Sequence, residues 1–168
     1  MENCTDSVDK SQKKAAFTHN LISTSYHEAG HTIYGLLHFM KIESVQIFKD
    51  ECNHVNGYTH FDFFSAGDVV SQDILNFAVY ADVCLRYAGL TAEKYHFKTI
   101  SGSDKFPMFL KDGSSEDTMM AAKLIKQYNL AGPGKPRTKL KKKLIKSILQ
   151  ILQCNWESVN LVAHGLFD

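Results

Sequence analysis

The chain has 168 residues, of which 44% are hydrophobic and 22% are charged, as in an ordinary globular domain. Nineteen Lys and Arg residues against 18 Asp and Glu residues leave a net charge of +1, which excludes a strong overall attraction to nucleic acid or to a membrane surface. No apolar run approaches the roughly 18 residues of a membrane span, and the polar N-terminus lacks the apolar segment of a signal peptide. We therefore expect a cytoplasmic protein.

The four cysteines, Cys4, Cys52, Cys84 and Cys154, lie far apart in the sequence and form no CxxC pair. Cytoplasmic thiols of this kind are usually free and often buried. We therefore expect no chemical role for them.

The N-terminal half of the chain predicts a tail, a helix and two strands. Residues 1–15 are polar and are expected to form a flexible tail, which leaves residues 16–168 as a single domain. Hydroxyl side chains at residues 23–25 offer caps for a first helix. The helix would carry an apolar stripe at helical spacing: Tyr26, Ala29, Ile33, Leu36, Leu37 and Met40.

The next two segments are expected to be extended. Residues 43–49 alternate as a strand, with Val45 and Ile47 on one side. Residues 54–63 read as a second strand, in which Asn56-Gly57 marks a turn or bulge.

The C-terminal half predicts three helices separated by loops. The first covers residues 68–88, where eight apolar or small residues share one face: Val70, Ile74, Phe77, Ala78, Ala81, Cys84, Leu85 and Ala88. Residues 99–113 are expected to form a loop, and a further helix is expected to begin within residues 113–117. Residues 129–137 are expected to form the loop that ends this helix. One last helix carries a long apolar face: Leu144, Ile148, Ile151, Leu152, Trp156, Val159, Val162 and Leu166. The fold class is therefore mainly α (α+β), with a short sheet or hairpin beside the first helix.

The stretch "HEAGH" carries the clearest chemical signal in the sequence. His27 and His31 lie one helical turn apart on the same face, so two imidazole nitrogens can reach one zinc ion at about 2.0–2.1 Å. Glu28 lies about 100° around the helix, where it can take a proton from a metal-activated water. The alternative is a solvated polar helix face. The apolar stripe of the same helix lies roughly opposite the two histidines, which favours a metal site on a second surface.

Spacing alone offers two candidates for a third ligand, His38 and Glu51. The metzincin pattern places a third histidine six residues after the second, but His38 comes one residue late. On a continuous helix His38 lies about 10 Å along the axis from His31, too far to share the ion. Glu51 has a suitable spacing but falls in a strand–turn region rather than on a following helix, so it is disfavoured.

The residues around this motif resemble the zinc peptidase domain of the FtsH family. The helix of that domain commonly reads YHEAGHA, and "YHEAGHTI" here is followed in the family's order by four further similar segments. These segments are "VNGYTHFD" (55–62), "YAGLTAEKYHF" (87–97), "DGSSEDTMMAA" (112–122) and "LQCNWESVNLVAHGLF" (152–167).

The resemblance implies a helical FtsH-like peptidase domain, with the short hairpin beside the HExxH helix, that binds one Zn²⁺ per chain. It makes His27 and His31 zinc ligands, Glu28 the general base and Asp117 the third ligand. It also implies that the edge strand presents the backbone of Gly57, Tyr58 and Thr59 to an extended peptide by strand addition.

Asp117 has a second explanation. Ser114 and Asp117 form an S-x-x-D pattern at a helix start, where a carboxylate stabilises the first turn. The resemblance favours the ligand role. Asp104, in "SGSD", is the other candidate for the third ligand.

The chain also departs from the family. It has no GxxxxGK[ST] loop for ATP, and Leu90 stands where the family has arginine. The loop between Glu93 and Gly113 is longer than the family norm. FtsH enzymes feed substrates with an attached ATPase, so this chain would cut only loose segments unless a separate ATPase or adaptor delivers them. The sequence leaves a homo-oligomer open.

We therefore predict a zinc metalloendopeptidase that acts on peptides or unfolded proteins. Tyr26, Tyr58 and His60 are all candidates for stabilising the oxyanion. The first alternative is a non-catalytic zinc-binding regulatory or interaction module that retains the peptidase fold. The second is a nucleic-acid binder, because residues 135–146 hold seven Lys and Arg residues. Few aromatics interleave with this run, so we interpret it as a solvated helix start and expect no nucleic acid.

Overall fold

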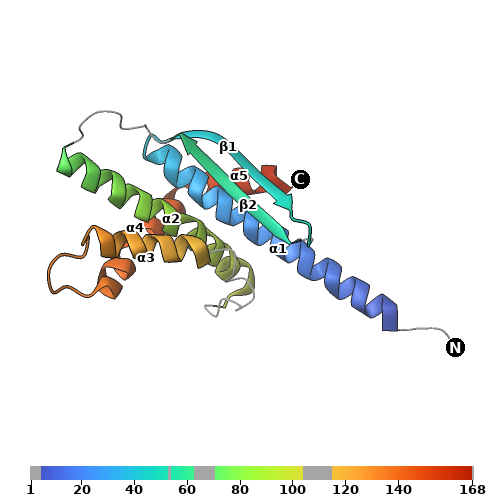
Figure 1. The fold of residues 1–168 in the computed structure, drawn as a ribbon. Coiled ribbons are helices and arrows are strands. Elements are labelled where there is room, and N and C mark those ends of the chain that lie inside the picture. Colours follow the sequence, from blue (N-terminus) through green and yellow to red (C-terminus); the bar gives the residue numbers. More distant parts are fainter. Residues whose placement is uncertain (1–4, 53, 63–70, 104–114, 168) are drawn as a thin grey trace.

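The computed structural model describes residues 5–167 except 53, 63–70 and 104–114, and it describes only the backbone of residues 5–19 and 115. Over the described residues the chain is mainly helical with a two-stranded antiparallel sheet, which confirms the predicted fold class (Figure 1). No helix among them is long and apolar enough to cross a membrane. The elements are α1 (Thr5–Leu37), β1 (Lys41–Lys49), β2 (Val55–Asp62), α2 (Gln72–Ser101), α3 (Ser115–Gln127), α4 (Arg137–Cys154) and α5 (Trp156–Phe167).

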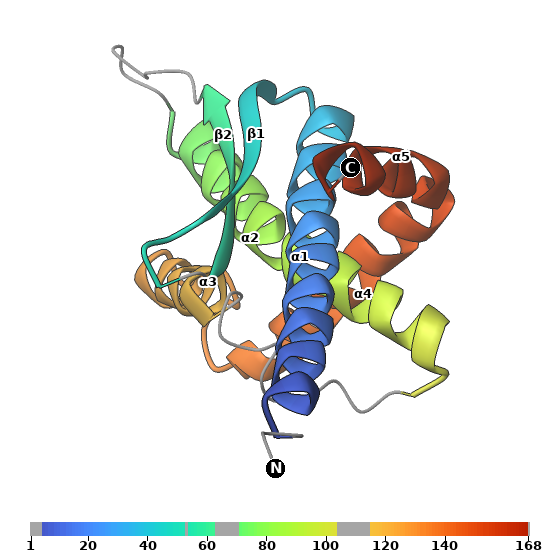
Figure 2. The ribbon, with the colours of Figure 1, turned by 90° about the vertical axis from the view of Figure 1, so that its right-hand side faces the viewer.

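Helices α1 and α2 cross at the centre of the molecule, and the other elements pack around this pair. The sheet and α5 lie against α1, while α3 and α4 lie against α2 (Figure 2). The two central helices touch closely because of a small residue: a Cβ atom at Gly30 would lie 2.6 Å from the Cβ of Ala92 and 2.7 Å from the carbonyl oxygen of Ala88. The crossing brings the polar face of α1 against α2.

Helix α1 differs from its prediction at both ends. It begins at Thr5 rather than near residues 23–25, so most of the expected tail is helical. Residues 5–15 contain no proline or glycine, and nothing in their sequence ends a helix. At the other end Leu36 and Leu37 are 53% and 42% exposed, so the predicted apolar stripe leaves the core after Ile33 and meets it again at Met40, which lies just beyond the helix.

The two predicted strands are present, and they pair antiparallel from Lys49↔Val55 to Lys41↔Asp62. Asn56 and Gly57 pair with Phe48 and Ile47 inside β2, so the predicted turn or bulge at these two residues is wrong. The register irregularity lies instead between Ile42 and Ser44 on β1. The chain reverses between Lys49 and Val55, where the side chain of Asp50 accepts hydrogen bonds from the backbone N–H groups of Cys52 and His54.

Helix α2 begins later and ends later than predicted. The side chain of Ser71 caps its start, and Gly102 ends it with a φ of 65°, a left-handed conformation that glycine adopts without strain. Ile74 and Phe77 are 58% and 71% exposed, so the predicted apolar face becomes core only from Val79 onward. Of the predicted loop at 99–113, residues 99–101 are helical and residues 104–114 lie outside the described residues.

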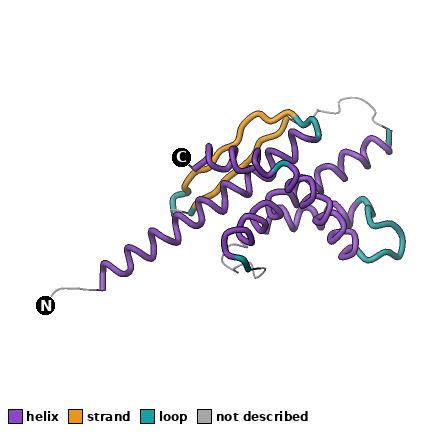
Figure 3. Tube along the Cα trace, turned by 180° about the vertical axis from the view of Figure 1, so that it is seen from behind, coloured by secondary structure: helices purple, strands orange, loops and turns teal. Residues whose placement is uncertain are grey.

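The predicted last helix is in fact two helices. Asn155 interrupts it with a φ of −121°, and its side-chain amide donates a hydrogen bond to the Ile151 carbonyl oxygen at 2.8 Å. The break turns α5 back across α1 (Figure 3). Trp156 then stacks on Tyr26 at 5.7 Å between ring centroids and meets the edge of Tyr95 at 4.6 Å. Buried residues of both helices still join the core: Leu144, Ile148, Leu152, Val159 and Ala163.

Candidate metal centre

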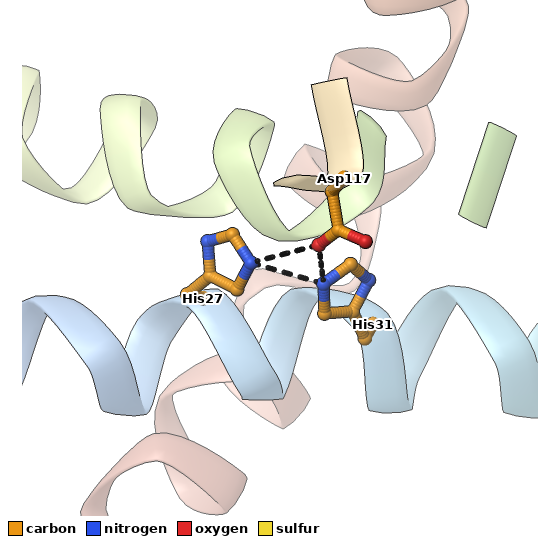
Figure 4. Close-up of side chains that lie close together, drawn as sticks. All are labelled: His27, His31 and Asp117. Atoms are coloured by element: carbon orange, nitrogen blue, oxygen red, sulfur yellow. Dashed lines mark hydrogen bonds and ion pairs between the residues drawn. The ribbon is translucent and has the colours of Figure 1, made fainter. Parts of the chain in front are cut away.

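Three ligand-type atoms meet between α1 and the first turn of α3 (Figure 4). The Nε2 atoms of His27 and His31 are 3.0 Å apart. Asp117 Oδ2 lies 3.3 Å from His27 Nε2 and 3.0 Å from His31 Nε2. Ligands of a tetrahedral zinc ion bound at about 2.0–2.1 Å lie about 3.3 Å apart. The three atoms therefore form a nearly equilateral triangle of the size that one zinc ion requires.

Hydrogen bonds on the far side of each imidazole determine which nitrogen faces this triangle. His31 Nδ1 lies 2.9 Å from the Leu85 carbonyl oxygen, and His27 Nδ1 lies 3.3 Å from Glu93 Oε2. A carbonyl or carboxylate oxygen can only accept, so each Nδ1 carries the proton and donates it. In the neutral rings both Nε2 atoms are then acceptors, and they converge with an acceptor oxygen of Asp117. Three converging acceptors need a proton or a metal ion between them.

The charge balance shows the same demand for a cation. Burial by itself would lower the pKa of His27, but hydrogen bonds to the carboxylates of Asp117 and Glu93, with the nearby charge of Glu28, raise it to about 10. Burial would raise the pKa of the Asp117 carboxyl, but His27 and His31 hold that pKa below its ordinary value. When no metal is bound, a proton on His27 therefore supplies the positive charge between the three acceptor atoms.

Three residues of α2 support the site, and none of them was predicted to do so. Glu93 is 6% exposed, holds His27 and accepts a hydrogen bond from the Ser23 hydroxyl. Arg86 Nη1 donates to Asp117 Oδ1 at 3.2 Å. Gly89 makes room for the imidazoles, because a Cβ atom there would lie 2.5 Å from His31 Nε2. Two features of the sequence could have pointed to this role. Glu93 is a carboxylate and Gly89 a glycine within the apolar part of a helix, where both residue types are uncommon unless they have a structural or functional role.

Glu28 lies beside the triangle but is not part of it. Its side chain is held by Thr59, whose hydroxyl donates to Glu28 Oε2 at 2.8 Å. Strand β2 can lie close to the Glu28 side chain because residue 57 is a glycine: a Cβ atom there would lie 2.6 Å from Glu28 Cγ. Gly57, Tyr58 and Thr59 line the same pocket as His27, Glu28, His31 and Asp117, with a cavity volume of about 260 Å³. The structure thus brings together all seven residues that the sequence predicted as catalytic, metal-binding or substrate-binding.

The structure places the other candidates elsewhere. Tyr26 is buried and its hydroxyl donates to Asn160, while His60 pairs with Glu43 at 3.1 Å. Of the three candidates for the oxyanion, Tyr58 is therefore the one that lines the pocket.

The disfavoured third ligands also lie away from the triangle. His38 Nδ1 lies 2.8 Å from the Tyr34 carbonyl oxygen, and its ring stacks on Tyr34. Glu51 is exposed in the turn after β1. Asp104 falls outside the described residues. Leu90, at the position of the family's arginine, is buried in α2 at 8% exposure.

A scan of the chain against protein-family models gives no match, and a search of curated proteins gives none either. The chemistry of the site is therefore inferred from its own atoms. Two imidazole nitrogens and one carboxylate oxygen are a ligand set of catalytic zinc sites, in which a fourth position stays open. The carboxylate of Glu28 faces the pocket beside that set and has no place in it as a ligand.

Proposed function

We propose that this protein is a zinc-dependent metalloendopeptidase, similar in its site to the peptidase domain of the FtsH family. His27, His31 and Asp117 would hold one zinc ion. The observation that carries the proposal is the convergence of three acceptor atoms at 3.0–3.3 Å, with a separate carboxylate in the same pocket. A solvated helix face has no reason to bury two histidines to 7% exposure around an aspartate from another helix.

The bound ion would lower the pKa of water toward 7 and polarise the carbonyl group of a substrate. The protein's own contribution is proton transfer by Glu28. Its carboxylate takes a proton from the attacking water and passes it to the leaving amine. Thr59 keeps one oxygen of Glu28 in place, and burial to 4% exposure keeps bulk water from competing for it.

The substrate would bind as an extended chain along β2. Among the described residues the sheet contains two strands, so one edge of β2 pairs with no strand. Gly57, Tyr58 and Thr59 line the pocket, and a peptide added to this edge would pass over Glu28. This mode requires a peptide or an unfolded segment, which we propose as the substrate. We also propose that the protein acts in the cytoplasm, where a separate ATPase or adaptor delivers folded substrates.

The test is Glu28→Gln, measured by cleavage of an unfolded protein substrate and by zinc content. We expect cleavage to fall by about 10²–10⁴-fold while zinc stays bound, because the variant removes a base and no ligand. Glu116→Gln is the matched control, since Glu116 also lines the pocket but is exposed. Unchanged cleavage in Glu28→Gln would sink the proposed mechanism. Zinc without cleavage in the wild-type protein would favour the non-catalytic zinc-binding module.

A further inference from the structure

A second group of metal-ligating side chains lies in the turn that joins β1 to β2. Asp50, Cys52 and His54 each place one ligand-type atom within 4.8 Å of the others. None of the three lines the pocket of the candidate metal centre. Cys52, for which the sequence predicts no chemical role, thus lies within reach of two other ligand-type side chains.

Hydrogen bonds hold the backbone of Asp50, Cys52 and His54 together. Asp50 Oδ1 accepts hydrogen bonds from the backbone N–H groups of Cys52 at 2.9 Å and His54 at 2.8 Å. The backbone N–H of Asp50 also donates to the His54 carbonyl oxygen at 3.0 Å. Because these hydrogen bonds already hold the backbone of the three residues, ion binding would order little more of them than the side chains of Cys52 and His54, which lowers its entropic cost.

The side-chain geometry suits a single small ion. Asp50 Oδ2 and His54 Nδ1 are 3.1 Å apart, close to the roughly 3.3 Å between ligands of a tetrahedral zinc ion. Asn56 donates to the same Asp50 oxygen at 3.2 Å and orients it. The side chain of His54 is 75% exposed and Cys52 is exposed, so an ion can enter directly from solvent and complete its coordination with water.

The ligand types define the class of metal. A thiolate with an imidazole favours zinc, cobalt or copper, whereas magnesium and calcium prefer sites made of oxygen atoms alone. We propose that Asp50, Cys52 and His54 form a second site for a zinc-class transition-metal ion, independent of the candidate metal centre. An ion there would cross-link the turn from which β2 runs to Gly57 and Thr59, and so would stiffen the strand beside Glu28.

Cobalt(II) distinguishes the two sites, because only the second contains sulfur. We expect the wild-type protein, titrated with cobalt under a non-thiol reductant, to show a thiolate-to-cobalt charge-transfer band in the near ultraviolet. Cys52→Ser should lose this band. Cys154→Ser, which removes another exposed free thiol, should retain it. His31→Ala and Glu28→Gln should also retain it, so this test does not depend on the proposed peptidase activity.

A second variant guards against a change in fold. His54→Gln should weaken cobalt binding at this site by at least about tenfold, as measured by the band, while the helical circular dichroism stays unchanged. No thiolate band in the wild-type protein, or a band that persists in Cys52→Ser, would overturn the proposal.

Discussion

The two candidate metal sites are built in opposite ways. His27 and His31 lie on one helix, 90 and 86 residues before Asp117 on another, and both histidines are buried. Asp50, Cys52 and His54 come from one exposed turn. The first group exists only when α1, α2 and α3 are packed together, whereas the second needs only the turn to close. Metal binding at the first site should therefore be coupled to folding of the whole domain, and binding at the second to one hairpin.

The largest expected effect is the loss of a ligand at the buried site. Asp117→Asn should lower zinc affinity by more than about a hundredfold, since even a change outside the ligand shell costs roughly 10–100-fold. Asp73→Asn is the matched control, because Asp73 occupies the first turn of α2 as Asp117 occupies the first turn of α3. Competition with a chelator measures both. Equal effects would mean that Asp117 serves only as a helix-start residue.

A change that adds only one methyl group should be nearly as severe. Gly89→Ala places a Cβ atom 2.5 Å from His31 Nε2 and 2.7 Å from His27 Nε2, so both rings must move, and we expect zinc affinity to fall by about a hundredfold. Gly165→Ala, in α5, meets nothing within 4 Å and should instead add up to about 1 kcal/mol of stability through helix propensity. Thermal unfolding and zinc content separate the two outcomes. Normal zinc binding by Gly89→Ala would contradict the packing described for α2.

Removing a charge behind the ligands should have a smaller effect. Glu93→Gln keeps the shape and an acceptor for His27 Nδ1 but removes the negative charge, so zinc affinity should fall by about tenfold. Ser23→Ala leaves the carboxylate in place and should have less effect. The cobalt band of the exposed site should be unchanged in both variants. A Glu93→Gln protein with wild-type affinity would show that this carboxylate does not tune the ligand.

A change of one pH unit should have an effect no larger than that of Glu93→Gln. His27 holds a proton up to a pKa of about 10 in the metal-free fold, and zinc must displace it. Zinc affinity should therefore rise by up to about tenfold for each pH unit between about pH 6.5 and 8.5. Calorimetry of Cys52→Ser in buffers of different ionisation enthalpy, which isolates the buried site, should show proton release. Affinity that does not change with pH would contradict the proton-filled site.

The raised pKa of His27 also predicts how the stability of the metal-free protein changes with pH. Because the pKa of His27 is raised from an ordinary value of 6.5, its stabilising charge is fully present below pH 6.5 and is lost as the pH rises toward 10. The lowered pKa of Asp117 has its effect at acid pH: the stability that its charge contributes is lost as the pH falls below the ordinary range of a carboxyl. The charged pair therefore stabilises the metal-free fold most between about pH 4 and 6.5.

Local patterns predicted the parts of the site that lie within one element. The spacing of His27 and His31 sets their common face on a helix, and the prediction of an extended segment at 54–63 placed Tyr58 and Thr59 on a strand. Asp117 was favoured only through the resemblance, because an S-x-x-D pattern has a helix-start explanation of its own. Its distance to His31 depends on how α3 packs, which no local pattern contains.

The missed features depend on contacts between elements that are distant in the sequence. Glu93 and Arg86 become functional candidates only once α2 crosses α1 and α3. Periodicity showed an apolar face at Ile74 and Phe77 but could not show that nothing among the described residues buries it. Asn155 breaks a helix without a proline or glycine to signal it, so the reversal of α5 was not predicted.

That reversal docks the chain's single tryptophan on the helix that carries His27 and His31. Trp156 stacks on Tyr26, and Tyr26 directly precedes His27 on α1. Indole emission responds to its surroundings, and here those surroundings exist only while α5 is docked on the helix that carries His27 and His31. The protein thus contains an intrinsic optical probe, through which unfolding of the C-terminal helix can be followed without any label.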